Sequence, residues 1–186
     1  MNKILRYAVT GVATAALGIA SGAQAATTDS ADVTAEILTA LSVDVDATAD
    51  TLDFGTIADG GITANQAIVV DTTGARGPCP ASLICGGTTA APLFHVSGLS
   101  GKSVQIAFVN TSETLSYDTV TNGGPAPVGF ASAMTVNAFT TDAAANQVLL
   151  DAGGLADFSV GGTLNVQPNM APGVYNGTLT VSVAYN

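Results

Sequence analysis

Positively charged side chains are scarce in this sequence. Only four of its 186 residues are lysine or arginine, whereas 14 are aspartate or glutamate, and the formal net charge is −10. A surface of this sign repels the phosphates of nucleic acids and the headgroups of anionic membranes. We therefore expect no nucleic-acid partner and no direct membrane insertion.

Residues that carry catalysis are also few. The chain has one histidine, His95, which alternates with Phe94 and Val96 and is expected to point to solvent. General base catalysis needs partner groups around such a residue. The sequence contains no nucleophile-elbow motif, phosphate-binding loop or dinucleotide-binding glycine motif. These absences predict that the protein is not an enzyme and uses no cofactor.

Metal and sugar sites are disfavoured on similar grounds. Carboxylates cluster between Asp44 and Asp59, but Thr48 and Ala49 stand where a calcium loop needs a ligand and a glycine. We interpret Asp44 and Asp46 as part of a solvated strand face and predict no metal site. Tryptophan, an aromatic side chain that suits sugar-binding platforms, is absent. A calcium- or carbohydrate-binding module is therefore the least favoured non-enzymatic function.

The first 25 residues have the pattern of a secretory signal peptide. Lys3 and Arg6 form a short positive segment, residues 7–20 are apolar, and Ala23-Gln24-Ala25 matches a signal-peptidase site. The apolar segment is too short and too rich in glycine for a retained anchor, and no stop-transfer segment follows it. We expect a mature chain that begins at Ala26 and is exported to the periplasm.

Cys79 and Cys85 are the two cysteines of the chain. An exported protein folds in an oxidising compartment, where a disulfide is the default state of such a pair. Their spacing differs from that of C-x-x-C redox motifs and zinc sites. We predict a Cys79–Cys85 disulfide that staples a surface loop within Thr72–Ala91.

Apolar and polar residues alternate with a period of two along most of the mature chain, which is typical of half-buried strands. The first apolar row consists of Val33, Ala35, Ile37, Leu41, Val43 and Val45. Further strands are expected at Thr51–Ile57, Gln66–Asp71, Leu93–Gly98, Val104–Asn110, Thr114–Thr119, Met134–Thr140, Gln147–Asp151, Phe158–Val166 and Val174–Tyr185. Only Asp142–Asn146 looks helical, for one turn at most. Many short strands at about ten-residue spacing predict one all-β domain, an immunoglobulin-like β-sandwich.

The last predicted strand has a recognisable pattern. Its inward row consists of Leu179, Val181, Val183 and Tyr185, with Tyr185 next to last in the sequence and Gly173 fourteenth from the end. A glycine and an aromatic residue at these places resemble the C-terminal strand that periplasmic chaperones bind in chaperone–usher pilins. The alternative is an ordinary closing strand with a tyrosine at its end.

Longer segments carry a wider resemblance. The runs Leu52-Asp53-Phe54-Gly55-Thr56-Ile57, 161–166 and 172–183 are similar to the bacterial domain-of-unknown-function family 4402. The Gly-x-Tyr-x-Gly segment at 173–177 and the run Val33-Thr34-Ala35-Glu36-Ile37 also resemble major subunits of alpha-clade fimbriae and, more distantly, spore-coat-U-type pilins. Pilins of the common type differ in having a disulfide that joins distant strands.

The resemblance to pilins implies a sandwich that lacks one strand. An exposed sheet edge invites strand addition, and pilins are a known example of such complementation. By this resemblance residues 1–25 are the signal peptide, 26–40 an N-terminal extension and 41–186 the domain. Val33, Ala35 and Ile37 would insert into the groove of the next copy, with Thr39-Ala40 as the hinge. The implied protein is a subunit of a cell-surface fimbria that serves adhesion or biofilm formation.

The same resemblance implies partners during assembly. A periplasmic chaperone would pair with the last strand, and an outer-membrane usher would pass subunits to the surface as a head-to-tail filament. The main alternative is a monomeric, self-complete secreted or surface β-sandwich with an adhesive or binding function. In that protein residues 31–45 would form its own first strand.

Overall fold

We describe a computed structural model over residues 31–32 and 34–186. The predicted signal peptide and Val33 lie outside the described residues. The chain divides into two units, residues 1–36 and residues 37–186. In the first unit the described residues belong to no strand and are exposed to solvent. Over the described ranges, no helix is long and apolar enough to cross a membrane.

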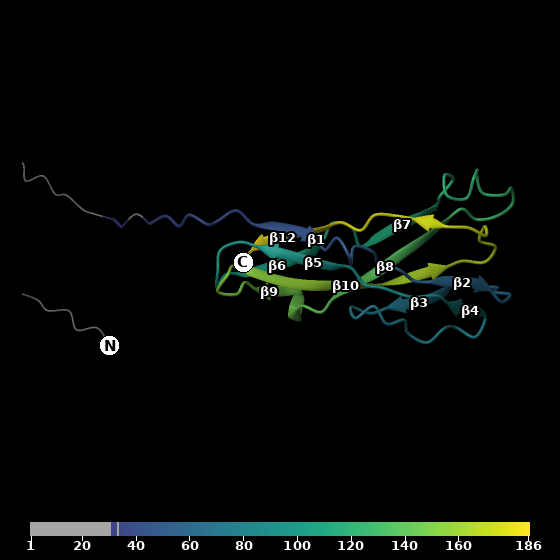
Figure 1. Cartoon of the computed structure of the whole chain (residues 1–186), viewed down its shortest axis with the longest axis horizontal. Helices are drawn as coiled ribbons and strands as arrows, with labels where there is room; N and C mark the ends of the chain where they lie inside the picture. The colour runs from purple at the N-terminus through teal and green to yellow at the C-terminus, as the bar shows by residue number, and fades with distance from the viewer. Residues whose placement is uncertain (1–30, 33) are drawn as a thin grey trace, which may run out of the picture. The chain divides into compact units, whose positions relative to one another are not determined.

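Residues 37–186 form an all-β unit (Figure 1). Its strands are β1 (Ser42–Val45), β2 (Thr56–Asp59), β3 (Gln66–Val70), β4 (Leu83–Gly86), β5 (Leu93–Ser97), β6 (Ser103–Phe108), β7 (Ser112–Tyr117), β8 (Ala133–Thr141), β9 (Gln147–Leu149), β10 (Leu155–Val166), β11 (Tyr175–Asn176) and β12 (Val181–Tyr185). A short 3₁₀ helix, η1, spans Ala144–Asn146. The all-β fold predicted from the two-residue period is confirmed.

The long strand β10 organises the largest sheet. Its first half pairs with β5 and its second half pairs with β3, while β8 lies along its other edge. The sheet continues outward from β5 to β1 and from β8 through β7 to β11, and every pairing is antiparallel. β1 and β11 end the main path of this sheet, and β3 lies off it beside β10.

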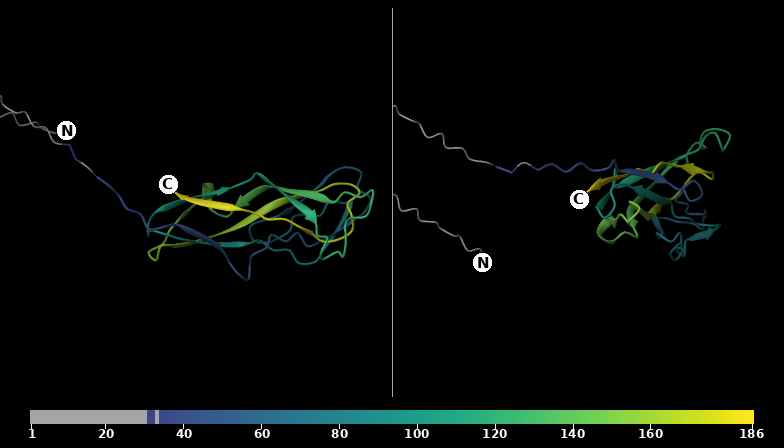
Figure 2. Two further views of the ribbon diagram at one scale, coloured as in Figure 1. Left: turned by 90° about the horizontal axis from the view of Figure 1, so that it is seen from above. Right: turned by 60° about the vertical axis from the view of Figure 1, so that its left-hand side comes forward.

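A second sheet packs across part of the first. It has the order β12-β6-β9, with β6 at its centre. Side chains from β6 meet those from β5 and β10 in one buried cluster, which makes this part of the unit a two-layered sandwich (Figure 2). The remaining pair, β2 and β4, forms a small sheet of its own.

The hydrophobic core consists of two clusters, and β10 contributes to both. The first cluster contains Phe54, Ile62, Ile68, Val70, Leu83, Val136, Leu164 and Val166. The second cluster contains Phe94, Val96, Val104, Ile106, Leu150, Phe158 and Val160. Alternate residues of β5 and β6 are buried, as the period of two predicts. Phe139 packs against both clusters and connects them.

Three predicted segments differ from the structure. Thr72–Ala91 was expected to be a loop but contains β4, because β4 finds its partner β2 far away in the sequence. The strand expected at Thr51–Ile57 begins only at Thr56. The strand expected at Val174–Tyr185 is divided into β11 and β12, because the chain crosses from one sheet to the other between them.

Candidate functional site

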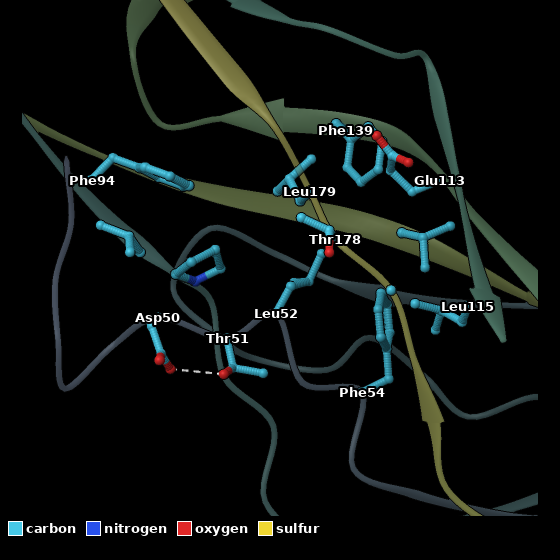
Figure 3. A pocket seen from close by; sticks show the side chains of 14 residues that line it. Asp50, Thr51, Leu52, Phe54, Phe94, Glu113, Leu115, Phe139, Thr178 and Leu179 are labelled. Atoms are coloured by element: carbon cyan, nitrogen blue, oxygen red, sulfur yellow. Dashed lines mark hydrogen bonds between the residues drawn. The ribbon is translucent and has the colours of Figure 1, made fainter. Parts of the chain in front are cut away.

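An open apolar groove of about 380 Å³ lies in the β-sandwich unit (Figure 3). It is lined by Val45, Asp50, Thr51, Leu52, Phe54, Pro92, Phe94, Glu113, Leu115, Val136, Phe139, Gly177, Thr178 and Leu179. These residues come from the end of β1 and the chain after it, from β5, β7 and β8, and from the crossing between β11 and β12. The groove is therefore bordered by strands of the largest sheet and by the chain that crosses from this sheet to the second one.

The floor of the groove is formed by core residues. Phe54 and Val136 belong to the first core cluster, Phe94 belongs to the second, and Phe139 contacts both. The Phe94 ring stacks on Phe158, with ring centroids 5.2 Å apart. The groove thus opens at the junction of the two clusters, where the apolar interior of the sandwich is accessible from one side.

Two segments with unpaired backbone line this groove (Figure 3). In the described part of the chain, the backbone N–H and C=O groups of residues 50–52 and 177–179 form no hydrogen bond with another residue. Pairing resumes at Asp53, which bonds Ala90, and at Thr180, whose carbonyl accepts from Val109. Strand-like backbone without a partner is a template for a further strand.

Gly177 explains how one of these segments reaches its position. A Cβ atom on Gly177 would lie 2.6 Å from Leu115 Cδ2 and 2.7 Å from the Thr114 carbonyl oxygen. Only glycine allows the chain to approach β7 this closely before it crosses to the second sheet. The crossing then places Leu179 over the groove and leaves its backbone groups without a partner.

Two carboxylates stand among the groove-lining residues. Asp50 accepts a hydrogen bond from the Thr51 hydroxyl at 2.8 Å, and Glu113 accepts one from Asn110 Nδ2 at 3.0 Å. The other lining residues are mostly apolar, and Figure 3 shows several of them directed into the groove. Such a site suits an extended apolar segment better than a charged small molecule.

The first apolar row is distributed between core, groove and solvent. Leu41 and Val43 pack against the second core cluster, whereas Val45, 43% exposed, lines the groove. Ile37 is 93% exposed and belongs to no strand. Ala35 lies in the first unit, and Val33 is outside the described residues, so their predicted insertion stays a prediction.

The C-terminal residues singled out in the sequence take different places. Leu179 lines the groove and, with Val181, Val183 and Tyr185, packs against the second core cluster. All four are half-buried, and among the described residues β12 pairs with β6 alone. Gly173 lies against β7 at a distance from β12 in the sequence, where a Cβ would be 2.5 Å from the Tyr117 ring. The predicted Cys79–Cys85 disulfide is present.

A cluster that the sequence did not reveal lies on the outer side of β5. His95 Nδ1 is 2.7 Å from Asp157 Oδ1, and His95 Nε2 is 3.1 Å from Asp46 Oδ2. The hydrogen bond to Asp157, followed by the one to Asp46, raises the pKa of His95. Asp46 and Asp157 are distant in sequence and meet His95 only through the pairing of β5 with β1 and β10.

Other carboxylates cap their own turns. Asp59 accepts the backbone N–H groups of Ile62 and Gly61, and Asp71 accepts the Thr73 hydroxyl and the Ala75 N–H. These bonds lower the pKa of both aspartates. Within residues 31–32 and 34–186, no group of three or more His, Cys, Asp or Glu is arranged to hold a metal ion.

The fold and the groove define an antiparallel all-β protein of the β-sandwich class. The family model described as a domain of unknown function (DUF4402) matches residues 43–185, and the chain therefore belongs to this family. The resemblance stated from the sequence is confirmed for this family, and the resemblance to pilins stays a prediction. No curated protein and no solved structure matches the chain.

Proposed function

We propose that this protein is the structural subunit of an extracellular fibre, and that its groove receives an extended strand from another copy. The observation that carries the proposal is the pair of unpaired backbone segments, residues 50–52 and 177–179, that line an apolar groove. An inserted strand would supply hydrogen-bond partners to both segments. Its alternate side chains would cover Phe54, Phe94 and Phe139.

The chain itself contains a segment of the required kind. Val33, Ala35 and Ile37 alternate with Asp32, Thr34 and Glu36, so that one face is apolar and the other polar. Burial of each valine or isoleucine side chain contributes about 1.5–3 kcal/mol. The exposure of Ile37 supports the proposal, because this side chain has no apolar cover within its own unit.

Insertion between copies would produce a filament. The donor segment and the groove are different surfaces, so each contact is head-to-tail and the assembly does not close on itself. We further propose that the protein is exported, that a chaperone pairs with β12 and an usher assembles the fibre, and that the protein has no enzymatic activity. The free edge of β12 supports the chaperone's place in this scheme.

The second candidate is a monomeric, self-complete adhesive sandwich. It is favoured by the fully buried side chains of Ile68, Val96, Val104 and Phe158, because both core clusters are well formed around the groove. In that case the groove would bind a ligand of another kind or none. The two candidates differ in whether residues 30–39 bind to the groove of a second molecule.

Peptide binding and fibre formation test the proposal together. A peptide of residues 30–39 is titrated into the exported protein, and NMR shifts of the methyl groups of Leu52, Leu115 and Leu179 are followed. We expect saturable shifts that an Ile37→Asp peptide does not give. In cells, Ile37→Asp should abolish fibres in electron micrographs, whereas Val128→Asp, a change at a fully exposed loop residue, should not. Normal fibres from Ile37→Asp would favour the self-complete sandwich.

A further inference from the structure

His95 stands between two carboxylates on the outer side of the main sheet. Both ring nitrogens are within hydrogen-bond distance of an aspartate oxygen, Nδ1 of Asp157 and Nε2 of Asp46. The three side chains come from β5, β10 and the residue directly after β1. The imidazole therefore connects the edge of the sheet, through β5, to its central strand.

The protonation state follows from the donors available. An ionised carboxylate can only accept hydrogen bonds, and a neutral imidazole has one donor nitrogen and one acceptor nitrogen. Neutral His95 could donate a hydrogen bond to only one of its two aspartates, and its other nitrogen would direct a lone pair toward the second carboxylate. Both contacts can be hydrogen bonds to ionised carboxylates at the same time only in the imidazolium, in which both nitrogens donate.

The surrounding charges favour that state. Asp44 lies opposite His95 in the register of β1, and Asp157 lies opposite it in the register of β10. Asp46 is the third carboxylate, and Asp142, directly after β8, accepts the backbone N–H of Ser159 in β10. The hydrogen bonds to Asp157 and Asp46 raise the pKa of His95.

Asp46 connects this cluster to the groove. Its Oδ1 accepts the backbone N–H of Thr48 at 2.7 Å and that of Ala49 at 3.1 Å, which closes a tight turn. Leu93 holds both ends of the turn, because its carbonyl accepts from Asp46 N and its N–H donates to the Ala49 carbonyl, each at 2.8 Å. The next residues along the chain, 50–52, are one wall of the groove.

We infer that His95 is a proton-controlled latch that fixes the wall formed by residues 50–52 and thereby regulates strand capture by the groove. When protonated, His95 ties Asp46, and with it the turn at residues 46–49, to β5 and β10. When neutral, it releases one of the two aspartates, and residues 50–52 lose one of the interactions that hold them in place. The link to strand capture rests on the proposed function, whereas the latch itself does not.

The test separates the latch from the function of the groove. Amide hydrogen exchange of Leu93 and Asp46 is measured on the full exported protein without peptide at about pH 6 and about pH 9, corrected for intrinsic exchange. We expect protection of these amides to fall about two- to fivefold at the higher pH, the range that an exposed ion pair provides. His95→Ala should show the lower protection at both pH values.

Asp157→Asn provides a matched control. The asparagine amide can donate to neutral His95 Nδ1 while Nε2–H still donates to Asp46, so the latch should stay closed and protection should not depend on pH. A pH dependence in Asp157→Asn or His95→Ala equal to that of the wild type would overturn the latch. So would wild-type protection that is the same at both pH values.

Regulation of the groove is measured with the peptide of residues 30–39. If the latch acts on the groove, wild-type affinity should be about two- to fivefold higher at about pH 6 than at about pH 9, and Asp157→Asn should remove this difference. Affinity that does not change with pH while amide protection does would overturn the regulatory link. Failure of the peptide to bind at either pH would contradict the proposed function. The latch would then be tested by the amide-exchange measurements alone.

Discussion

The phenol oxygen of Tyr185 joins the last strand to two other parts of the domain. It accepts a hydrogen bond from the backbone N–H of Leu99 at 2.7 Å and donates one to the carbonyl of Thr39 at 2.9 Å. Thr39 precedes β1, where the chain enters the sandwich. The tyrosine therefore has a structural role in the folded unit besides any role in chaperone recognition.

Substitution of Tyr185 should separate its hydroxyl from its ring. Tyr185→Phe keeps the packing against the second core cluster and removes two hydrogen bonds, so we expect a loss of about 1–2 kcal/mol. Tyr185→Ala also removes the ring, and a loss of up to about 3–5 kcal/mol is expected. Denaturant unfolding measures both changes. Equal losses in the two variants would show that the ring adds nothing.

Chaperone recognition is tested with the same pair of variants. If the chaperone reads the aromatic ring, Tyr185→Phe should co-purify with the chaperone as the wild type does, at matched periplasmic levels. Tyr185→Ala should be captured poorly. Unchanged capture of Tyr185→Ala would favour an ordinary closing strand.

Ile37→Asp and Val43→Asp should differ in their effect on the free energy of unfolding. Ile37 is exposed, and a charge there should leave the free energy of unfolding within about 0.5 kcal/mol of the wild type. Val43 packs against the second core cluster, and a carboxylate there should cost at least about 2 kcal/mol. Thermal unfolding measures both, and strong destabilisation by Ile37→Asp would contradict its assignment as an exposed donor residue.

Gly173 should not tolerate a side chain. An alanine Cβ would lie 2.5 Å from Tyr117 Cε2 and 2.8 Å from Asn122 Nδ2. Neither neighbour moves freely, because the Tyr117 ring packs on Tyr175 and Asn122 is bonded to both backbone groups of Val174. We expect Gly173→Ala to cost about 1–3 kcal/mol. Gly123→Ala is a partial control, since its Cβ meets no atom within 4 Å but its φ of 76° also disfavours alanine.

The Cys79–Cys85 disulfide should stabilise the protein locally. It closes the short loop from Cys79 to Cys85, which lies in β4, and the chain-entropy model gives about 2 kcal/mol for a loop of this size. The double change of both cysteines to serine should lower the free energy of unfolding by about this amount and increase amide exchange in β2 and β4 more than in β10. Alkylation of either thiol without prior reduction would show that the bond is not formed in the exported protein.

Stability should fall in acid for a reason that Asp118 illustrates. Its carboxylate accepts the Thr121 hydroxyl and the backbone N–H groups of Thr121 and Val120, and these bonds lower its pKa. Because the folded pKa is below the ordinary value of 3.8, the stabilising contribution is present above about pH 4 and is lost as the pH falls through the lowered pKa. Melting temperatures between about pH 6 and pH 2 measure this loss.

The matched variant is Asp118→Asn. It should be less stable than the wild type near neutral pH and should approach it at low pH, because the amide carries no charge to lose. A constant difference at all pH values would contradict the titration of Asp118.

The contribution of His95 to stability should change with pH in the opposite direction. Because the pKa of His95 is raised in the folded protein, its stabilising contribution is present below about pH 6.5 and is lost as the pH rises through the raised value.

The local pattern of the sequence was sufficient to predict the class of fold and several of its strands. Alternation of apolar and polar residues predicted β5, β6 and the inward row of β12, because a strand with one buried face imposes a period of two. The pair of cysteines at short spacing, together with the expected export of the chain, predicted the disulfide between Cys79 and Cys85. These features depend on neighbours in sequence.

The alternation of apolar and polar residues did not predict which side chains face the groove where the register of strand pairing shifts. Val136 and Phe139 have opposite parity in β8, yet both line the groove. Ala138 between them adopts a φ of 49°, and the register of β8 with β10 shifts between Gly161 and Thr163. Such a bulge turns both side chains to the same face. A two-residue period cannot express this change.

The sequence by itself determined that this chain is an acidic all-β protein of the DUF4402 family with a disulfide-stapled loop. Only the tertiary structure decided that residues 50–52 and residues 177–179 line one open groove, and that His95 meets Asp46 and Asp157. The physical reason is that burial of one face of a strand imposes alternating apolar and polar residues, and this alternation is visible within each segment. Which strands become neighbours depends on pairing between segments that are distant in the sequence, and the pattern of a single segment does not contain this information.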